Sequence, residues 1–342
     1  MQIIVNTKHS LHQSPGELTA DGYVPAFEKP ERAELVLARA KEVGLGQVSP
    51  ETPHDPAAIL RIHDAGMVAL LQNAAQEWAG LDRPPGAIPY TWTTRGMRQD
   101  RVPSSLDGRL SYYCFDAACP ITPTSWDAIK ASADCALTAT DLITNGAASA
   151  FALCRPPGHH AGSNYYGGYC FLNNIAIAAQ NLLDKGAKRI AILDVDYHHG
   201  NGTQEIFYGR DDVLVVNLHG DPDVEYPYHL GYADETGTGA GEGYNINFPL
   251  PHGTGWNSYA VALAEGIKRI GAYAPDAVLV SLGVDTYKDD PISHFKLDHP
   301  DYLRMGEMIK SLGKPTLFVM EGGYAVAEIG INAVNVLTGF GG

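Results

Sequence analysis

Two carboxylates and an imidazole stand at alternate positions directly after an apolar run in the middle of the chain. The run 189–193 reads Arg-Ile-Ala-Ile-Leu, and Asp194, Asp196 and His198 follow it. Residues at alternate positions of extended backbone point to the same side. Carboxylate oxygens and imidazole nitrogens are ligands that zinc accepts in proteins. The spacing therefore predicts a metal site, and a polar surface turn is the alternative that this stretch alone leaves open.

Side chains that carry acid, base or hydrogen-bonding chemistry follow four other apolar runs. They are His159 and His160 after 148–153, His219 and Asp221 after 213–218, Asp285 after 277–282, and Glu321 and Tyr324 after 316–320. In an open α/β sheet, ligands bind beyond the carboxyl ends of the strands. Neither a core nor a need for solubility explains five such ends together. We therefore expect these side chains to form one site.

The apolar runs also define the elements that position this site. The run 189–193 is continuous rather than alternating, which is typical of a strand buried on both faces of a parallel sheet. Strands are predicted over 148–153, 189–193, 213–218, 244–248, 277–282 and 316–320, and helices over 31–43, 67–78, 174–183 and 259–270. This alternation predicts an α/β fold whose mostly parallel sheet is covered by helices on both faces. The chain shows no repeat, low-complexity tract or linker, so we expect a single domain over residues 1–342.

The composition limits the kinds of partner and the compartment. The formal net charge of −15 argues against nucleic acid and membrane as partners, because both bind positively charged protein surfaces. The same charge favours a cationic substrate. Five cysteines without Cys-x-x-Cys spacing indicate reduced thiols. We find neither a signal-peptide pattern nor an apolar stretch near the ~18 residues of a membrane span. We expect a cytoplasmic protein.

Residues 83–125 differ in character from the rest of the chain. Six prolines stiffen this segment, and arginines and aromatic residues are interspersed in it against an acidic background. A structureless segment of this length inside a compact domain is usually functional, and arginines and aromatics are enriched at protein interfaces. We expect this segment to form a protein interface. The alternative is a surface loop that packs against the rest of its own chain.

Five motifs resemble one known group of enzymes. They are Arg-Pro-Pro-Gly-His-His at 155–160, Gly-Gly-Tyr-Cys-Phe-Leu-Asn-Asn at 167–174, Asp-Val-Asp-Tyr-His-His-Gly-Asn-Gly-Thr at 194–203, Ser-Leu-Gly-Val-Asp at 281–285 and Glu-Gly-Gly-Tyr at 321–324. The chain resembles the zinc-dependent deacetylases of the arginase–deacetylase fold, which include histone deacetylases and bacterial acetylpolyamine amidohydrolases. The resemblance covers nearly the whole chain, and motifs of this length in this order are highly specific.

The resemblance implies a role for each matching residue. It implies Asp196, His198 and Asp285 as zinc ligands, His159 and His160 as catalytic histidines, Tyr324 as the group that polarises the acyl oxygen, Tyr169 and Tyr226 as tunnel walls, and the Gly168 carbonyl as the acceptor of the substrate amide N–H. It also implies that Asp194 hydrogen-bonds the first histidine and helps to hold a structural potassium ion. The second histidine faces Asn201 instead. Because a neutral amide raises a histidine pKa less than a carboxylate does, we assign His160 as the general base.

Two rival functions are weaker. A two-manganese ureohydrolase of the arginase type needs bridging carboxylates at positions where this chain has Gly200 and Gly283, so we expect one ion per subunit. A pseudoenzyme that only binds acetylated ligands is disfavoured, because every catalytic residue of the motifs is present.

The acylated substrate is the harder question. Histone deacetylases carry an Asp directly before a Cys-Pro pair, whereas Cys119-Pro120 follows Ala118 here. Asp107 and Asp116 lie nearby and are expected to meet substrate ammonium groups. The segment 83–125 resembles the insertion through which acetylpolyamine amidohydrolases dimerise and narrow their entrance. We therefore expect a homodimeric deacetylase of acetylated polyamines, such as acetylputrescine or acetylcadaverine. Acetyl-lysine or another small acylamine is the alternative substrate, and iron(II) is the alternative metal.

Overall fold

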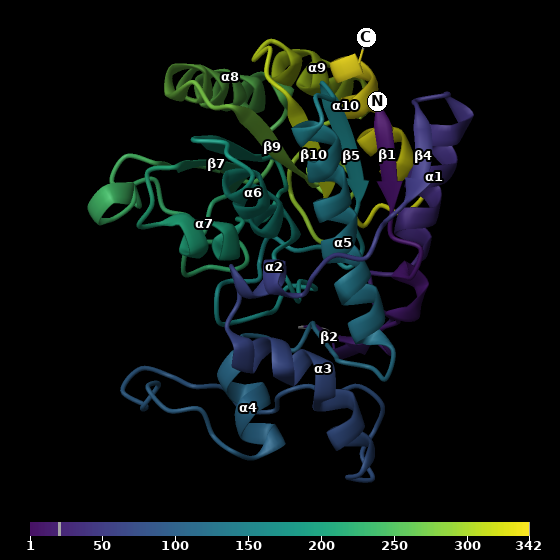
Figure 1. Ribbon diagram of the computed structural model, residues 1–342, viewed down its shortest axis with the longest axis vertical. Coiled ribbons are helices and arrows are strands. Elements are labelled where there is room, and N and C mark those ends of the chain that lie inside the picture. The colour runs from purple at the N-terminus through teal and green to yellow at the C-terminus, as the bar shows by residue number, and fades with distance from the viewer. Residues whose placement is uncertain (20–21, 342) are drawn as a thin grey trace.

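A parallel sheet of eight strands forms the centre of the molecule (Figure 1). This computed structural model describes residues 1–19 and 22–341. The strand order is β4-β1-β5-β10-β9-β6-β7-β8, and every neighbouring pair is parallel. The strands are β1 (Gln2–Val5), β4 (Gln47–Pro50), β5 (Ser149–Leu153), β6 (Ile190–Asp194), β7 (Val213–Gly220), β8 (Asn245–Leu250), β9 (Ala277–Leu282) and β10 (Thr316–Met320). A short antiparallel pair, β2 (Glu17–Thr19) and β3 (Gly22–Val24), forms a second sheet.

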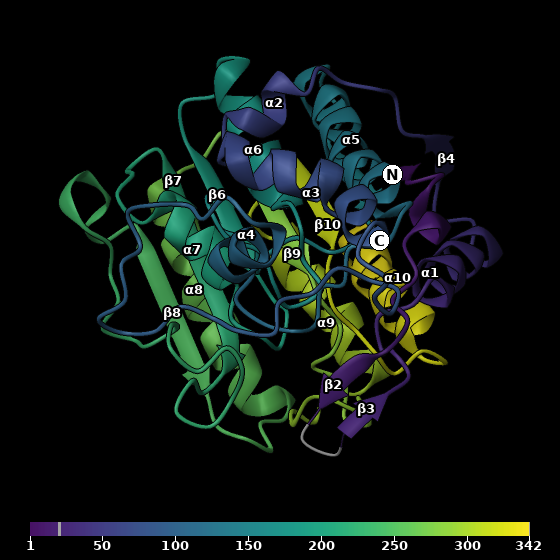
Figure 2. The same cartoon turned by 90° about the horizontal axis from the view of Figure 1, so that it is seen from below.

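Helices cover both faces of the large sheet (Figure 2). The core on one face includes side chains of α2 (Ala57–Leu60), α3 (Ala65–Ala79), α4 (Leu106–Tyr113), α5 (Ser125–Thr144), α6 (Asn174–Asp184) and α7 (Asn201–Phe207). The core on the other face includes side chains of α1 (Glu31–Glu42), α8 (Trp256–Tyr273), α9 (His299–Lys310) and α10 (Ile329–Gly341).

Strand β6 shows why its sequence is apolar throughout. Ile190 and Ile192 belong to one core, and Ala191 and Leu193 belong to the other. Successive side chains of a strand point to opposite faces, so a strand covered on both sides has no polar face. All five residues of β6 are buried, and the last of them, Asp194, is the first polar group of the site.

The α/β fold with a mostly parallel sheet, covered on both faces, is confirmed. The strands over 277–282 and 316–320 have the predicted bounds, and the others shift by one or two residues. Strand β6 extends to Asp194 because this residue is still in register with Ser281 and Asn217 of the neighbouring strands. Helix α8 begins three residues earlier than predicted, at Trp256.

The expectation of a structureless segment at 83–125 was wrong in part. Helix α4 lies within it, and the Ser105 hydroxyl accepts a hydrogen bond from the Gly108 N–H at its start. Such a cap compensates for the missing intrahelical partner of the first N–H groups. Helices α3 and α4 lie beyond the carboxyl ends of the sheet strands (Figure 1). Across the described residues, the helices are all too short or too polar to cross a membrane.

Candidate active site

Three potential metal ligands meet where β6 and β9 end. Asp196 and His198 lie in the loop after β6, and Asp285 lies in the loop after β9. Each offers one ligand atom, and these atoms all lie within 4.8 Å of one another. The Nδ1 atom of His198 is 3.0 Å from Asp285 Oδ2 and 3.4 Å from Asp196 Oδ1. All three side chains are buried.

The charges of this cluster fit a cation. Burial, together with the charge of Asp196, raises the pKa of Asp285 to about 7. Within the described part of the chain, the ion pairs of these two aspartates are all with histidines rather than with Lys or Arg. Two adjacent buried carboxylates without a Lys or Arg partner are costly. A divalent ion would offset that cost.

Backbone groups hold the two carboxylates in place. Asp285 Oδ1 accepts from the Tyr197 N–H at 2.7 Å, and Asp196 Oδ2 accepts from the Gly322 N–H at 2.8 Å. A Cβ atom at Gly283 would overlap the Asp196 carboxylate. The chain therefore has no room there for a second bridging carboxylate, which agrees with the expectation of one ion.

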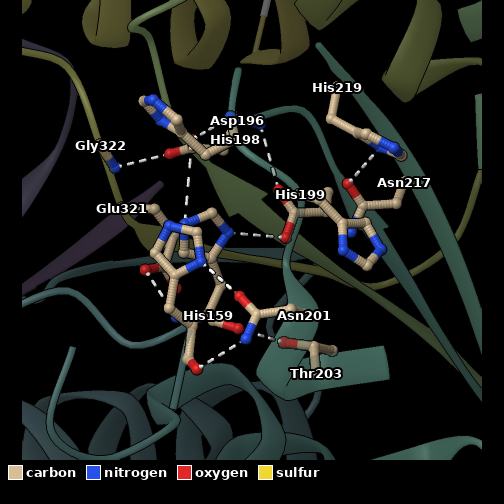
Figure 3. A network of polar contacts seen from close by, with 12 residues as sticks. His159, Asp196, His198, His199, Asn201, Thr203, Asn217, His219, Glu321 and Gly322 are labelled. Atoms are coloured by element: carbon tan, nitrogen blue, oxygen red, sulfur yellow. Dashed lines mark hydrogen bonds and ion pairs between the residues drawn. The ribbon is translucent and has the colours of Figure 1, made fainter. Parts of the chain in front are cut away.

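His159 lies beside this cluster in the loop after β5 (Figure 3), and His160 follows it in the chain. Their ring centroids are 4.1 Å apart. His159 Nδ1 is 3.0 Å from Asp194 Oδ2, and His160 Nδ1 is 2.6 Å from Asn201 Oδ1. The two partners are those that the sequence predicted, one charged and one neutral.

The two histidines differ in electrostatics accordingly. Burial alone would lower the pKa of His159, but the charges of Asp196 and Asp194 outweigh it and raise the pKa to about 10. Burial lowers the pKa of His160 well below its usual value, and the positive charge of His159 adds to this effect. His160 is therefore held neutral and His159 charged.

Tyr324 approaches from the loop after β10. Its backbone N–H donates to Asp290 Oδ2 at 2.7 Å, and its ring lies 5.5 Å from that of Tyr169. The Arg32 guanidinium lies 4.8 Å from the centroid of the Tyr324 ring. Arg32 also donates to the Gly323 carbonyl at 2.7 Å, so it fixes the loop that carries the tyrosine.

Sequence reasoning missed Arg32, although a signal was present. Arg32 occupies the first turn of α1 and is buried. It stands four residues before Val36, which the helical pattern places on the apolar face. Residues four apart lie on the same side of a helix, so a cation at this position pointed to a buried partner.

A cavity of about 430 Å³ leads to these groups. His160, His198 and Tyr324 line it, together with Tyr169 and Tyr226. Its other lining residues include Phe27, Ile292, Glu17, Asp116, Gly168 and Glu225. The structure thus brings the predicted wall residues together in one cavity that reaches His198.

Asp116 and Asp107, the two carboxylates expected to meet the substrate, lie in different surroundings. Asp116 lines the cavity, but its Oδ2 accepts from the Gly168 N–H at 2.9 Å and from the Tyr226 hydroxyl at 2.8 Å. It therefore braces the walls, and burial raises its pKa. Asp107 does not line the cavity and instead forms a two-bond ion pair with Arg83.

Glu17 is a cavity carboxylate that the sequence did not single out. It lies on β2, and its Oε2 accepts from the Tyr169 hydroxyl at 2.5 Å. Burial is the main cause that raises its pKa. No local motif marks this residue, because only the packing of the β2–β3 pair brings it to the cavity.

Gly168 and Tyr169 form a tight turn at the cavity wall. Both have positive φ, +57° and +65°. A Cβ atom at Gly168 would lie 2.5 Å from the His160 ring. Glycine at this position therefore allows the backbone to approach the histidine.

Comparisons with known proteins agree with this site. A model of the family described as "Histone deacetylase domain" matches residues 26–340. The chain belongs to this family. Its fold is thus that of a deacetylase, a hydrolase of a family that typically depends on a metal ion, and the resemblance seen in the motifs is confirmed.

Individual relatives are similar over their whole length. The chain is 58% identical to "Acetylpolyamine amidohydrolase 2" of Pseudomonas aeruginosa, over 100% of this chain and 99% of the relative. It is 48% identical to "Acetylpolyamine amidohydrolase" of Mycoplana ramosa, with 100% of both chains covered. A crystal structure of acetylpolyamine aminohydrolase from Burkholderia pseudomallei matches with a TM-score of 0.94 at 37% identity, over 100% of this chain and 98% of that chain.

Proposed function

We propose that this deacetylase removes the acetyl group from acetylated polyamines with one divalent metal ion per chain. The observation that carries the proposal is a cavity that has carboxylates on its walls and reaches His198, which is one of three clustered potential metal ligands. The full-length relatives named acetylpolyamine amidohydrolases support the substrate class. The ion is zinc, with iron(II) as the alternative, held by Asp196, His198 and Asp285.

Zinc bound at this position would polarise the acetyl carbonyl and lower the pKa of a bound water. His160, neutral and oriented by Asn201, takes a proton from the attacking water. A histidine of the pair then returns a proton to the leaving amine. His159 faces the Asp194 carboxylate, and this hydrogen bond holds its ring in one orientation beside His160.

Tyr324 and the cavity walls position the substrate. The Tyr324 hydroxyl donates a hydrogen bond to the acetyl oxygen, and this bond strengthens as negative charge develops there. Tyr169 and Tyr226 flank the methylene chain, and the Gly168 carbonyl accepts the amide N–H. The wall carboxylates attract the distal ammonium group, and a confined mouth screens this attraction less than an open surface does.

Three further expectations remain part of this proposal. Asp194 is buried and accepts from the Asp196 N–H at 3.1 Å, and its charge supports the structural potassium ion. The exposed side chains of Tyr90 and Met97 support contact of the segment 83–125 with a second subunit. All five cysteines are free and buried, which supports a reducing compartment such as the cytoplasm.

The decisive experiment compares turnover of acetylputrescine, acetylspermidine and an acetyl-lysine peptide by one preparation. We expect kcat/KM for at least one acetylpolyamine to exceed that for the peptide by more than about tenfold. A higher value for the peptide would favour the alternative, a deacetylase of acetyl-lysine. Asp285→Asn is the matched control, because it removes one metal ligand and should abolish turnover of all three substrates.

A further inference from the structure

A second cluster of metal-binding side chains lies beside the cavity, outside the catalytic centre. Glu225, in the segment after β7, His252, after β8, and His294, after β9, each offer a ligand atom, and these atoms lie within 4.8 Å of one another. Glu225 Oε2 is 3.1 Å from His252 Nε2 and 4.0 Å from His294 Nε2. The two imidazole rings lie side by side, with centroids 4.3 Å apart.

We propose that Glu225, His252 and His294 form a second, weaker zinc site at the wall of the cavity. Two imidazoles and one carboxylate form a donor set that zinc uses with a fourth position open to water. A simple ion pair explains the cluster less well, because both ring nitrogens face the same carboxylate oxygen. A divalent ion would use all three side chains as ligands.

The surrounding structure holds the Glu225 carboxylate and joins the two histidine loops before an ion binds. The Gly253 N–H donates to the His294 carbonyl at 2.8 Å, so the loops that carry the two histidines are joined. The Tyr197 hydroxyl donates to Glu225 Oε2, and Glu225 Oε1 accepts from the Tyr226 N–H at 3.1 Å. Hydrogen bonds of this kind orient metal ligands and raise metal affinity.

The side chains of this outer site are more exposed to solvent than those of the inner site, which is the buried cluster of Asp196, His198 and Asp285. The side chains of His252 and His294 are 41% and 59% exposed, whereas that of Glu225 is 11% exposed. An ion can therefore reach the site directly from solvent. Exposed side chains must be ordered on binding, which costs conformational entropy. The outer site is therefore filled only after the inner one, and protein purified without added metal retains one tightly held ion.

The test is calorimetric titration of the metal-stripped, full-length protein with Zn²⁺. We expect two classes of site in the wild-type protein and one class in the double variant His252→Ala/His294→Ala. Removing a hydrogen-bond partner of a ligand alone lowers metal affinity 10–100-fold, so each single variant should weaken the second step at least about tenfold. His229→Ala is the matched control, since it removes an exposed histidine outside the cluster, and it should retain both steps.

Two outcomes would overturn the proposal. One is a single class of site in the wild-type protein, and the other is a second step that persists in the double variant. A third preparation, Asp285→Asn, separates the two sites, because it should lose the tight step and keep the weak one. These readouts measure binding, so they do not depend on the identity of the substrate.

Occupation of the outer site has a consequence that rests on the proposed function. Glu225 lines the cavity, so a bound ion would replace a negative wall charge by a positive one. Zinc at a concentration that fills the outer site should raise KM for acetylputrescine severalfold in the wild-type protein and leave it unchanged in the double variant. Equal KM shifts in both proteins would overturn this consequence.

Discussion

The carboxyl edge of the sheet and the segment 83–125 differ in how they hold their charged groups. At the sheet edge, Asp196 and Asp285 are buried and accept hydrogen bonds from backbone N–H groups. In the segment, Arg98 pairs with Asp100 on the surface, with about two thirds of both side chains exposed. Catalysis requires groups that hold one geometry, and recognition of a flexible substrate or a second subunit tolerates adaptable ones. We therefore propose that the first region carries out the chemistry and that the second contributes to selectivity.

The largest effect should come from the general base. His160→Ala removes the group that takes the proton, and general acid–base catalysis contributes about 10²–10⁴-fold. We expect kcat to fall by about 10³-fold or more while the metal content stays at one tightly held ion per chain. Metal analysis and steady-state kinetics check this together. Near-normal turnover would remove His160 from the mechanism.

Tyr324→Phe should have the next largest effect. Loss of one oxyanion donor typically lowers kcat by 10²–10³-fold. The ring contact with Arg32 is retained in the phenylalanine variant, so we expect thermal unfolding and metal content to be unchanged. A variant with wild-type kcat would show that the hydroxyl serves packing rather than chemistry.

Changes in the segment should alter selectivity more than chemistry. Replacing residues 89–98 by a short Gly-Ser linker removes exposed Tyr90 and Met97. We expect monomers whose preference for acetylpolyamines over acetyl-lysine peptides falls by about tenfold, because the neighbour's wall is missing. Sedimentation reports the oligomer and paired kcat/KM values report the selectivity. A monomeric wild-type protein, or a truncated monomer with unchanged selectivity, would contradict the assignment.

The smallest effect concerns His63, which joins the start of α3 to the catalytic loops. Its Nδ1 is 2.9 Å from the Gly162 carbonyl, and its Nε2 accepts from the Asn173 N–H at 2.9 Å. The ring must be neutral to make both bonds, and burial lowers its pKa to about 4. Below pH 6.5 the unfolded chain binds the proton and the folded chain does not, so stability is lost as the pH falls from 6.5 towards 4.

At pH 5.5 this histidine alone should lower the free energy of unfolding by about 1 kcal/mol relative to pH 7.5. Urea unfolding at the two pH values measures the change. His63→Asn should be less stable at pH 7.5 and should lose less stability on acidification than the wild-type protein. An identical pH dependence in the two proteins would assign the acid sensitivity to other groups.

The local sequence determined the strands and the reactive groups that follow them. Continuous apolar runs are recognisable because a strand covered on both faces has no polar side, and β9 and β10 have the predicted bounds. Asp196, His198 and Asp285 were predicted to meet because the ends of neighbouring parallel strands share one edge. The resemblance of the motifs to a known family also implied the different partners of His159 and His160.

Only the tertiary structure decided which distant groups complete the site. Arg32 and Glu17 reach Tyr324 and Tyr169 from the N-terminal region, and Glu225, His252 and His294 meet from three separate loops. Asp107 and Asp116 are nine residues apart and chemically alike, yet one forms a partly exposed ion pair and the other braces the cavity wall. Hydrophobic periodicity in the sequence indicates on which face of its own strand or helix a side chain lies. The burial and partners of a charged group depend on loops packed against it from elsewhere in the chain, and these contacts leave no local pattern in the sequence.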